Sequence, residues 1–177
     1  MPRTRWLGVA ISGVAAIGFI WGCRSIGFRI NTSPSAAPGL WLITDDHVPP
    51  VHGTYVALCL SDEWAAWAAG RHYIAADGEC PGHREGLLKQ VIAIPGDTVV
   101  VSDAGIAVDG RPIPSSKPLA ADDEKRPLHG IDLGTYEVVP GQIWVIGPGD
   151  PSSFDSRYFG PVAEESIYRT ARPWLTF

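Results

Sequence analysis

The sequence predicts a mainly β protein, in which an antiparallel β domain with one short helix follows an N-terminal transmembrane helix. Three observations lead to this prediction. An uncharged apolar run lies near the N-terminus, short β-branched segments recur through the rest of the chain, and turns rich in the 16 prolines and 20 glycines separate them. At 177 residues, the chain suits one domain with an appendage.

The uncharged run covers residues 6–23, after a short tail of residues 1–5. As a helix it would extend about 27 Å, which is close to the thickness of the hydrocarbon core of a bilayer. Trp6 and Trp21 lie near its two ends, and tryptophan favours the lipid–water interface. The run therefore predicts a membrane anchor, with residues 24–177 forming an extracytoplasmic domain.

Two kinds of cleaved signal are alternatives to a retained anchor. A secretory signal would have a shorter apolar core and a cleavage site between small residues, and neither is clear here. A lipoprotein signal would end at Cys23, but the bulky Trp21 does not suit such a site. Arginines flank the run on both sides, so their charges do not decide the orientation; a short N-terminus with a large exported domain is the usual arrangement.

Short apolar and β-branched segments predict the strands that follow the anchor. In chain order they are Leu40–Thr44, Thr54–Leu60, Leu87–Ile94, Thr98–Ser102, Ile106–Val108, Tyr136–Val139, Gln142–Ile146 and Ser166–Thr170. One segment, Asp62–Ala76, predicts a helix, because Ser61 can cap its N-terminus and acidic residues fill its first turn. Residues 112–129 are rich in proline and charge, and they predict a polar surface loop.

The cysteines indicate an oxidising compartment. Cys23 lies at the membrane boundary, which leaves Cys59 and Cys80 as a pair in the domain. In an exported domain such a pair favours a disulfide, worth about 3 kcal/mol in the chain-entropy model. Two buried free thiols are the alternative. A zinc site that adds His83 lacks a fourth ligand and paired-cysteine spacing.

Composition also bears on partners and cofactors. The net charge is −5 and no block of lysine and arginine stands out, so we expect no nucleic-acid partner. The short elements show no sign of nucleotide or metal machinery, and we expect no cofactor and no metal. The five histidines are scattered among turns, loops and the predicted helix, and none forms a recognisable pair with a nucleophile.

Lys89 differs from the two other lysines, because it lies within the otherwise apolar segment Leu87–Ile94. Burial disfavours the ammonium form and lowers the pKa of a lysine. A general base near neutrality needs a pKa of about 7–8 in place of about 10.4, a bias of about 4 kcal/mol. A neutral amine can then deprotonate a serine hydroxyl. The alternative is that strand alternation points Lys89 at solvent.

Two segments carry hydroxyl groups that such a lysine would need. Asn31–Trp41, NTSPSAAPGLW, follows the anchor and would alone be a linker. Ser152–Gly160, SSFDSRYFG, adds a carboxylate and a guanidinium. Asp155 and Arg157 would share a face in extended chain and could pair, although a surface ion pair in a polar turn is the simpler interpretation.

The order of these segments resembles the type I signal peptidases, a family of membrane-anchored Ser-Lys proteases. That order is a serine-rich stretch after an anchor, an apolar strand with lysine that ends in Ile-Pro-Gly-Asp, and Ser-x-Asp-Ser-Arg-x-x-Gly. Three features resemble more closely the conjugal-transfer branch, the TraF-type pilin-processing peptidases. They are Asn-Thr-x-x-Ser…Gly-Leu-Trp, the Cys59 and Cys80 pair with Cys-Pro-Gly leading to Leu-Leu-Lys, and the tail Ala-Arg-Pro-Trp-Leu-Thr-Phe.

The resemblance implies a role for each candidate residue. Ser35 matches the family's nucleophile, and Lys89 its general base. Ser33 matches the residue whose hydroxyl assists the nucleophile's N–H in the oxyanion hole, where one donor is typically worth 10²–10³ in rate. Ser153 matches the hydroxyl that orients the lysine. Asp155 and Arg157 match the ion pair that supports the site.

Two departures concern the type of substrate more than the chemistry. Ala36 follows Ser35 where general signal peptidases usually have methionine, and Gln90 follows Lys89 where a basic residue is frequent. The expected function is therefore processing of exported precursors at the membrane surface, above all maturation of a conjugative pilin by cleavage or by cyclisation. The expected location is the bacterial inner membrane with the domain in the periplasm, and the expected partners are the membrane, a pilin precursor and the conjugative secretion apparatus.

Two other functions are alternatives. A general signal peptidase would share the chemistry but act on many precursors. A non-catalytic, envelope-anchored β domain that scaffolds a secretion or conjugation system would use Ser33 and Ser35 only as linker, and Lys89 only as surface.

Overall fold

The computed structural model describes residues 22, 27–45 and 48–177. The anchor expected over residues 6–23 lies outside these residues, apart from Gly22. Among the residues that are described, no helix has the length and apolar character needed to span a bilayer.

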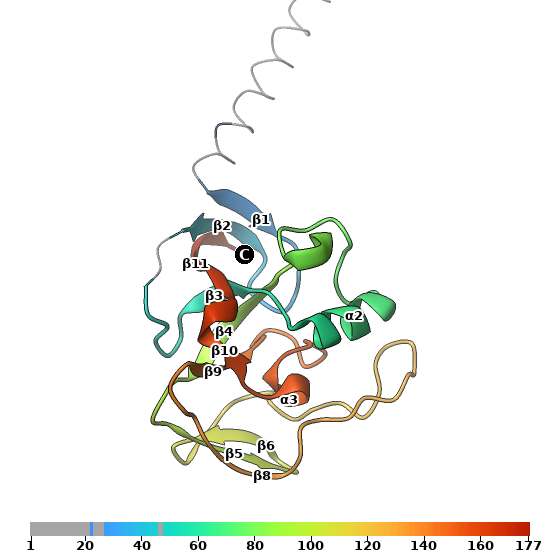
Figure 1. The fold of residues 1–177 in the computed structure, drawn as a ribbon, viewed down its shortest axis with the longest axis vertical. Helices are drawn as coiled ribbons and strands as arrows, with labels where there is room; N and C mark the ends of the chain where they lie inside the picture. Colours follow the sequence, from blue (N-terminus) through green and yellow to red (C-terminus); the bar gives the residue numbers. More distant parts are fainter. Residues whose placement is uncertain (1–21, 23–26, 46–47) are drawn as a thin grey trace, which may run out of the picture.

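Two antiparallel sheets contain most of the regular secondary structure of the described chain (Figure 1). The larger has seven strands in the order β1-β2-β11-β3-β4-β9-β10, and the smaller has four in the order β7-β6-β5-β8. The strands of the larger sheet are β1 (Phe28–Asn31), β2 (Gly39–Thr44), β3 (Tyr55–Leu58), β4 (Leu87–Ala93), β9 (Gln142–Ile146), β10 (Val162–Ala163) and β11 (Ile167–Thr176). Those of the smaller are β5 (Thr98–Ser102), β6 (Gly105–Val108), β7 (Arg111–Pro112) and β8 (Gly134–Glu137). The mainly β fold expected from the sequence is confirmed.

The helical elements are short. They are α2 (Asp62–Gly70), α3 (Ser156–Phe159) and the 3₁₀ turns η1 (Pro81–His83) and η2 (Glu164–Ser166). Ser61 caps α2 by accepting a hydrogen bond from the N–H of Trp64, as expected. The prediction that this helix continues to Ala76 is wrong, because it ends at Gly70 and His72 then takes a positive φ of 61°. The second helix, α3, was not expected.

The predicted and observed bounds of a strand differ most for β11. The sequence predicts a strand over Ser166–Thr170, but β11 runs to Thr176 between β2 and β3. Pro173 has no N–H to donate, and the pairing with β2 changes register just after it. On both sides of this change, β11 remains paired with β2. The first strand, β1, was also not expected, and it pairs with β2 across the serine-rich segment.

Of the three apolar clusters among the described residues, two hold the layers together. One packs α2 and α3 onto the larger sheet, and within it Trp67 stacks on Phe154 with ring centroids 5.1 Å apart. The other packs β4 and β9 against β5 and β6, around Trp144 and Ile146. Because β4 contributes to both clusters, its two faces are covered, and so a lysine on this strand is buried.

Candidate active site

The serine-rich segment forms the loop of a hairpin. Asn31 at the end of β1 pairs with Gly39 at the start of β2, and the residues between them carry Ser33 and Ser35. Ser35 is only 8 % exposed. Its Oγ lies 2.9 Å from the Oγ of Ser33, and its N–H donates a longer hydrogen bond of 3.4 Å to the same oxygen. One hydroxyl thus contacts both groups of Ser35 that an acyl-transfer reaction uses.

Lys89 lies on β4 opposite Val56 of β3, and it is 3 % exposed, so the alternative in which it faces solvent is wrong. Its Nζ donates a 2.6 Å hydrogen bond to the Oγ of Ser153. Burial lowers the pKa of Lys89 to about 8, and the charge of Arg157 also lowers it, whereas the charges of Asp155 and Asp150 raise it. A substantial fraction of this amine is therefore neutral near pH 8.

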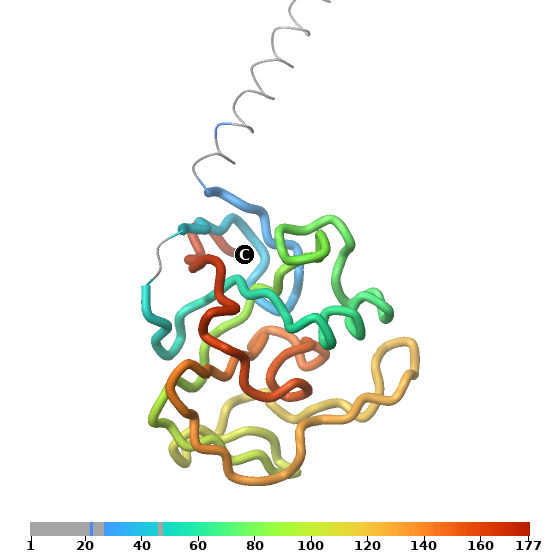
Figure 2. Tube along the Cα trace, viewed as in Figure 1, coloured from blue at the N-terminus to red at the C-terminus, as the bar shows by residue number. Residues whose placement is uncertain are grey.

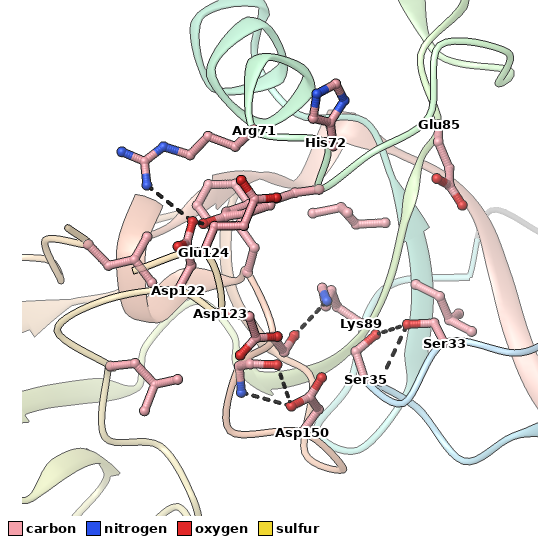
Figure 3. A pocket seen from close by; sticks show the side chains of 18 of the residues that line it. Ser33, Ser35, Arg71, His72, Glu85, Lys89, Asp122, Asp123, Glu124 and Asp150 are labelled. Atoms are coloured by element: carbon pink, nitrogen blue, oxygen red, sulfur yellow. Dashed lines mark hydrogen bonds and ion pairs between the residues drawn. The ribbon is translucent and has the colours of Figure 1, made fainter. Parts of the chain in front are cut away.

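Ser33, Ser35, Lys89 and Ser153 line one cavity of about 390 Å³ (Figure 3). Among the described residues, the Ser33–Ser35 pair and the Lys89–Ser153 pair are each hydrogen-bonded internally but not to each other. The two pairs face one cavity from different elements, the first from the β1–β2 hairpin and the second from β4 and the loop before α3. The sequence-predicted hydroxyls and amine are thus brought together.

Gly147, directly after β9, lies between the two pairs. A Cβ on this residue would clash with the Oγ of Ser153 and would come 2.8 Å from the Cβ of Ser35, closer than real Cβ atoms approach other atoms. Its N–H donates a 2.8 Å hydrogen bond to the carboxylate of Asp155. The absence of a side chain here is what allows the two serines to approach each other. No motif in the sequence points to this role, because it arises only from tertiary contact.

Substitution of Gly147 by alanine should therefore push Ser35 away from Ser153, and so from Lys89, without changing the identity of any of these three residues. A displacement of about 1 Å at a reacting group costs about 10²-fold in rate, so for the Ser-Lys peptidase activity expected from the sequence, kcat/KM for peptide cleavage should fall by at least that factor. Gly70→Ala is the control, because a Cβ at Gly70 meets no atom within 4 Å. Full activity in Gly147→Ala, measured with the same peptide substrate, would contradict this account of the site.

Asp155 and Arg157 form a buried ion pair behind the cavity, with both side chains at 0 % exposure and N to O distances of 2.8 Å. The two residues pair as expected, but neither in an extended segment nor at the surface, because Asp155 is the buried N-cap of α3 and accepts a hydrogen bond from the N–H of Arg157. The guanidinium also donates to the carbonyl oxygens of Asp150, Pro151 and Ser153. The pair therefore holds the loop that carries Ser153.

Residues 112–129 form one wall of the same cavity, with Leu119, Asp122 and Leu128 among its lining residues. Figure 2 shows this loop reaching up beside the end of α2. Asp122 accepts hydrogen bonds of 2.6 Å from Tyr73 and 2.7 Å from Arg126, and lies 3.5 Å from Arg71. Although burial opposes ionisation, the hydrogen bonds from Tyr73 and Arg126 hold the pKa of the Asp122 carboxyl well below its usual range. Sequence reasoning did not identify this network.

Cys59 and Cys80 form a disulfide, which rules out both free thiols and a zinc site that uses them as ligands. The bond ties the end of β3 to the turn η1, and so closes the excursion that contains α2. Within this excursion, Arg71, His72 and Tyr73 line the cavity. The disulfide therefore restrains the wall of the cavity that bears Arg71 and Tyr73.

The chain is similar to known proteins over nearly its whole length. The family model for signal peptidase, peptidase S26, matches residues 3–175. The plasmid transfer protein TraF of Escherichia coli is 34 % identical over 175 residues, 96 % of this chain and 94 % of that protein. The conjugal transfer protein TraF of Agrobacterium fabrum is 36 % identical over 179 residues, 98 % and 95 % of the two chains.

Signal peptidase I proteins match less of the chain. That of Mycobacterium tuberculosis is 39 % identical over 90 residues, 48 % of this chain and 31 % of that protein. The crystal structure of a signal peptidase I from Enterococcus faecalis covers 71 % of this chain and 98 % of its own, with 21 % identity and a TM-score of 0.39.

Proposed function

Because the chain belongs to the signal peptidase family, peptidase S26, we propose that it is a serine endopeptidase in which Ser35 and Lys89 form a catalytic dyad. The observation that carries this proposal is the burial of Lys89, with its amine held by Ser153, in the cavity that Ser35 also lines. A lysine on the surface would keep its ordinary pKa and could not act as a base near neutrality. The burial of Lys89 favours this function over that of a silent scaffold.

In the proposed mechanism, the neutral amine of Lys89 takes the proton of the Ser35 hydroxyl as its Oγ bonds to the scissile carbonyl carbon. The N–H of Ser35 and the hydroxyl of Ser33 donate to the resulting oxyanion, and Ser153 holds Lys89 in place. The ammonium of Lys89 then protonates the leaving amine as the C–N bond breaks, which leaves an acyl-enzyme on Ser35. Water ends the cycle by hydrolysis, and a substrate amine ends it by closing a ring.

The proposed substrate is an exported precursor, most specifically a conjugative pilin with small side chains before the cut. The similarity to plasmid and conjugal transfer proteins named TraF supports this assignment over a general signal peptidase, which matches only about half of the chain. Ser35 lies twelve residues after Cys23, so it can reach no farther than about 40 Å from the end of the proposed anchor. Such a site would act on peptides that emerge from the same membrane.

The proposed location is the bacterial inner membrane, with residues 6–23 as a single span and residues 24–177 in the periplasm. The Cys59–Cys80 disulfide supports an oxidising compartment for the domain. The proposed partners are the membrane, the pilin precursor and the conjugative secretion apparatus.

Co-expression with a pilin precursor tests the function. We expect the wild-type chain to mature the precursor and Ser35→Ala to leave it unprocessed, while Ser102→Ala, in the remote strand β5, serves as the control. Intact mass distinguishes the outcomes, because a cyclic product is one water lighter than the linear one. If Ser35→Ala, folded and in the membrane, still matured the pilin, the dyad would be wrong. Removal of N-terminal leaders from many unrelated precursors would instead indicate a general signal peptidase.

A further inference from the structure

Asn31 makes an unusual set of contacts with the loop that carries the two serines. Its Nδ2 donates to the carbonyl oxygens of Ser33 and Ala36, both at 3.0 Å, and of Ala37 at 3.2 Å. Its Oδ1 accepts a 3.1 Å hydrogen bond from the N–H of Ser33. One side chain thus bonds to both backbone groups of Ser33 and to the residues that follow Ser35.

These contacts replace the backbone hydrogen bonds that usually shape a loop. Pro34 and Ser35 form a turn, but residues 32–37, all of them described, make no backbone–backbone hydrogen bond of good geometry with one another. Trp41, which also lies outside residues 32–37, donates a 2.9 Å hydrogen bond from its Nε1 to the carbonyl of Ala37. The conformation around Ser33 therefore depends on Asn31, because Trp41 binds only the far end of the loop.

We propose that Asn31 is a positioning residue that acts on Ser35 through Ser33. By holding the N–H and the carbonyl of Ser33, it fixes the peptide units on both sides of that residue, and so the direction of the Cα–Cβ bond that carries its hydroxyl. That hydroxyl in turn contacts the Oγ and the N–H of Ser35. The inference rests on the proposed function, in which the Ser33 hydroxyl stabilises the oxyanion.

The chemistry of the side chain explains why asparagine is needed. Its neutral amide supplies two N–H donors and one acceptor at the end of a short side chain. Aspartate keeps the acceptor for the Ser33 N–H but places a carboxylate against three carbonyl oxygens. Alanine removes every contact. A comparison of the two substitutions therefore separates the effect of the Oδ1 acceptor from the effect of the Nδ2 donors.

A double-mutant cycle between Asn31→Ala and Ser33→Ala, in the full chain in detergent micelles with a pilin-derived peptide, tests the proposal. We expect Asn31→Ala to lower kcat about 10²-fold with little change in KM, and Ser33→Ala to lower it 10²- to 10³-fold. The double variant should be no more than about threefold worse than Ser33→Ala, because Asn31 acts through Ser33. Losses that multiply, or a raised KM with unchanged kcat, would overturn the proposal.

Hydrogen exchange provides a second test that does not depend on activity. In Asn31→Ala we expect the amide of Ser33 to exchange faster while the melting temperature changes little, and in Asn31→Asp the same amide should stay protected. Unchanged exchange in Asn31→Ala would overturn the proposal. Thr32→Ala is the matched control in the same loop and should keep full activity; an equal loss in that variant would also overturn it. Full activity in Ser35→Ala would instead refute the proposed function.

Discussion

Substitution of Lys89 by methionine is expected to abolish peptide cleavage and, at pH 7, to make the protein more stable. Removal of one member of a nucleophile–base pair typically lowers kcat by about 10⁴- to 10⁶-fold. Methionine has a similar length and is apolar, so it fills the space of Lys89 without bringing a charge into the core. Loss of activity and gain of stability in one variant would indicate that the fold accommodates Lys89 at a cost.

The size of the gain follows from the pKa of Lys89, which burial lowers from 10.5 to about 8. Below about pH 8 the lysine is protonated in both states, and the folded state bears the full cost of the buried ammonium, about 3 kcal/mol. The hydrogen bond to Ser153 is lost in the variant and offsets about 1 kcal/mol of this. We therefore expect a net gain of about 2 kcal/mol at pH 7.

The dependence on pH has a definite sign. Between pH 8 and 10.5 the unfolded chain still binds the proton that the folded chain has released, so the stability of the wild type rises with pH. The advantage of Lys89→Met should therefore shrink over this window. Thermal unfolding of both proteins from pH 7 to 10.5 measures this difference in stability. In a separate measurement, kcat/KM of the wild type should rise with pH up to about 8.

Lys117 provides the control for this prediction. It is exposed in the loop 112–129, so Lys117→Met should alter neither activity nor the pH dependence of stability. If Lys89→Met were less stable than the wild type at pH 7, the amine would be better solvated than its burial indicates. A kcat/KM that does not depend on pH between 6 and 9 would argue against Lys89 as the base.

Asp155→Asn is expected to lower the free energy of unfolding by about 3–5 kcal/mol, because it leaves the buried charge of Arg157 without its partner. The carboxylate also accepts from the N–H of Gly147, the glycine between Ser35 and Ser153. The charge of Asp155 raises the pKa of Lys89, and that of Arg157 lowers it. The acid limb of the pH–rate profile should therefore move to lower pH.

Glu124→Gln is the matched control for Asp155→Asn. Glu124 pairs with Arg126 at 3.2 Å, but its side chain is 64 % exposed, and exposed pairs contribute about 0–1 kcal/mol. Thermal unfolding by circular dichroism compares the two variants. A similar, small shift in both would show that the buried pair contributes no more than a surface pair.

Much of the fold followed from local patterns. The strands Thr98–Ser102 and Gln142–Ile146 have the bounds that the sequence predicts, because turns flank each of them closely. The length of β11 did not follow, since a proline inside a strand usually marks its end, whereas β11 continues past Pro173 with a change of register beside it. For α3, the residue types Asp155 and Gly160 were available signals of a short helix, and the structure shows them as its N-cap and its C-cap.

Some features of the candidate site could likewise be predicted from the sequence, and others could not. The sequence indicated which hydroxyls, which amine and which ion pair to consider, because their residue types and their order carry information. It could not decide the burial of Lys89, since alternation is uninformative on a strand covered on both faces. The role of Gly147 and the contacts of Asp122 depend on segments far apart in the chain, and no local pattern encodes them.

The place of β11 in the sheet has a consequence for how the protein is made. The hairpin that carries Ser35 and the strand that carries Lys89 are joined across the sheet by β11, in the order β1-β2-β11-β3-β4. This strand is the last of those described, so it leaves the ribosome after both. Until β11 inserts, the serine and the lysine belong to separate halves of an unfinished sheet. A nascent chain would therefore hold the two side chains of the proposed dyad apart until β11 has been made.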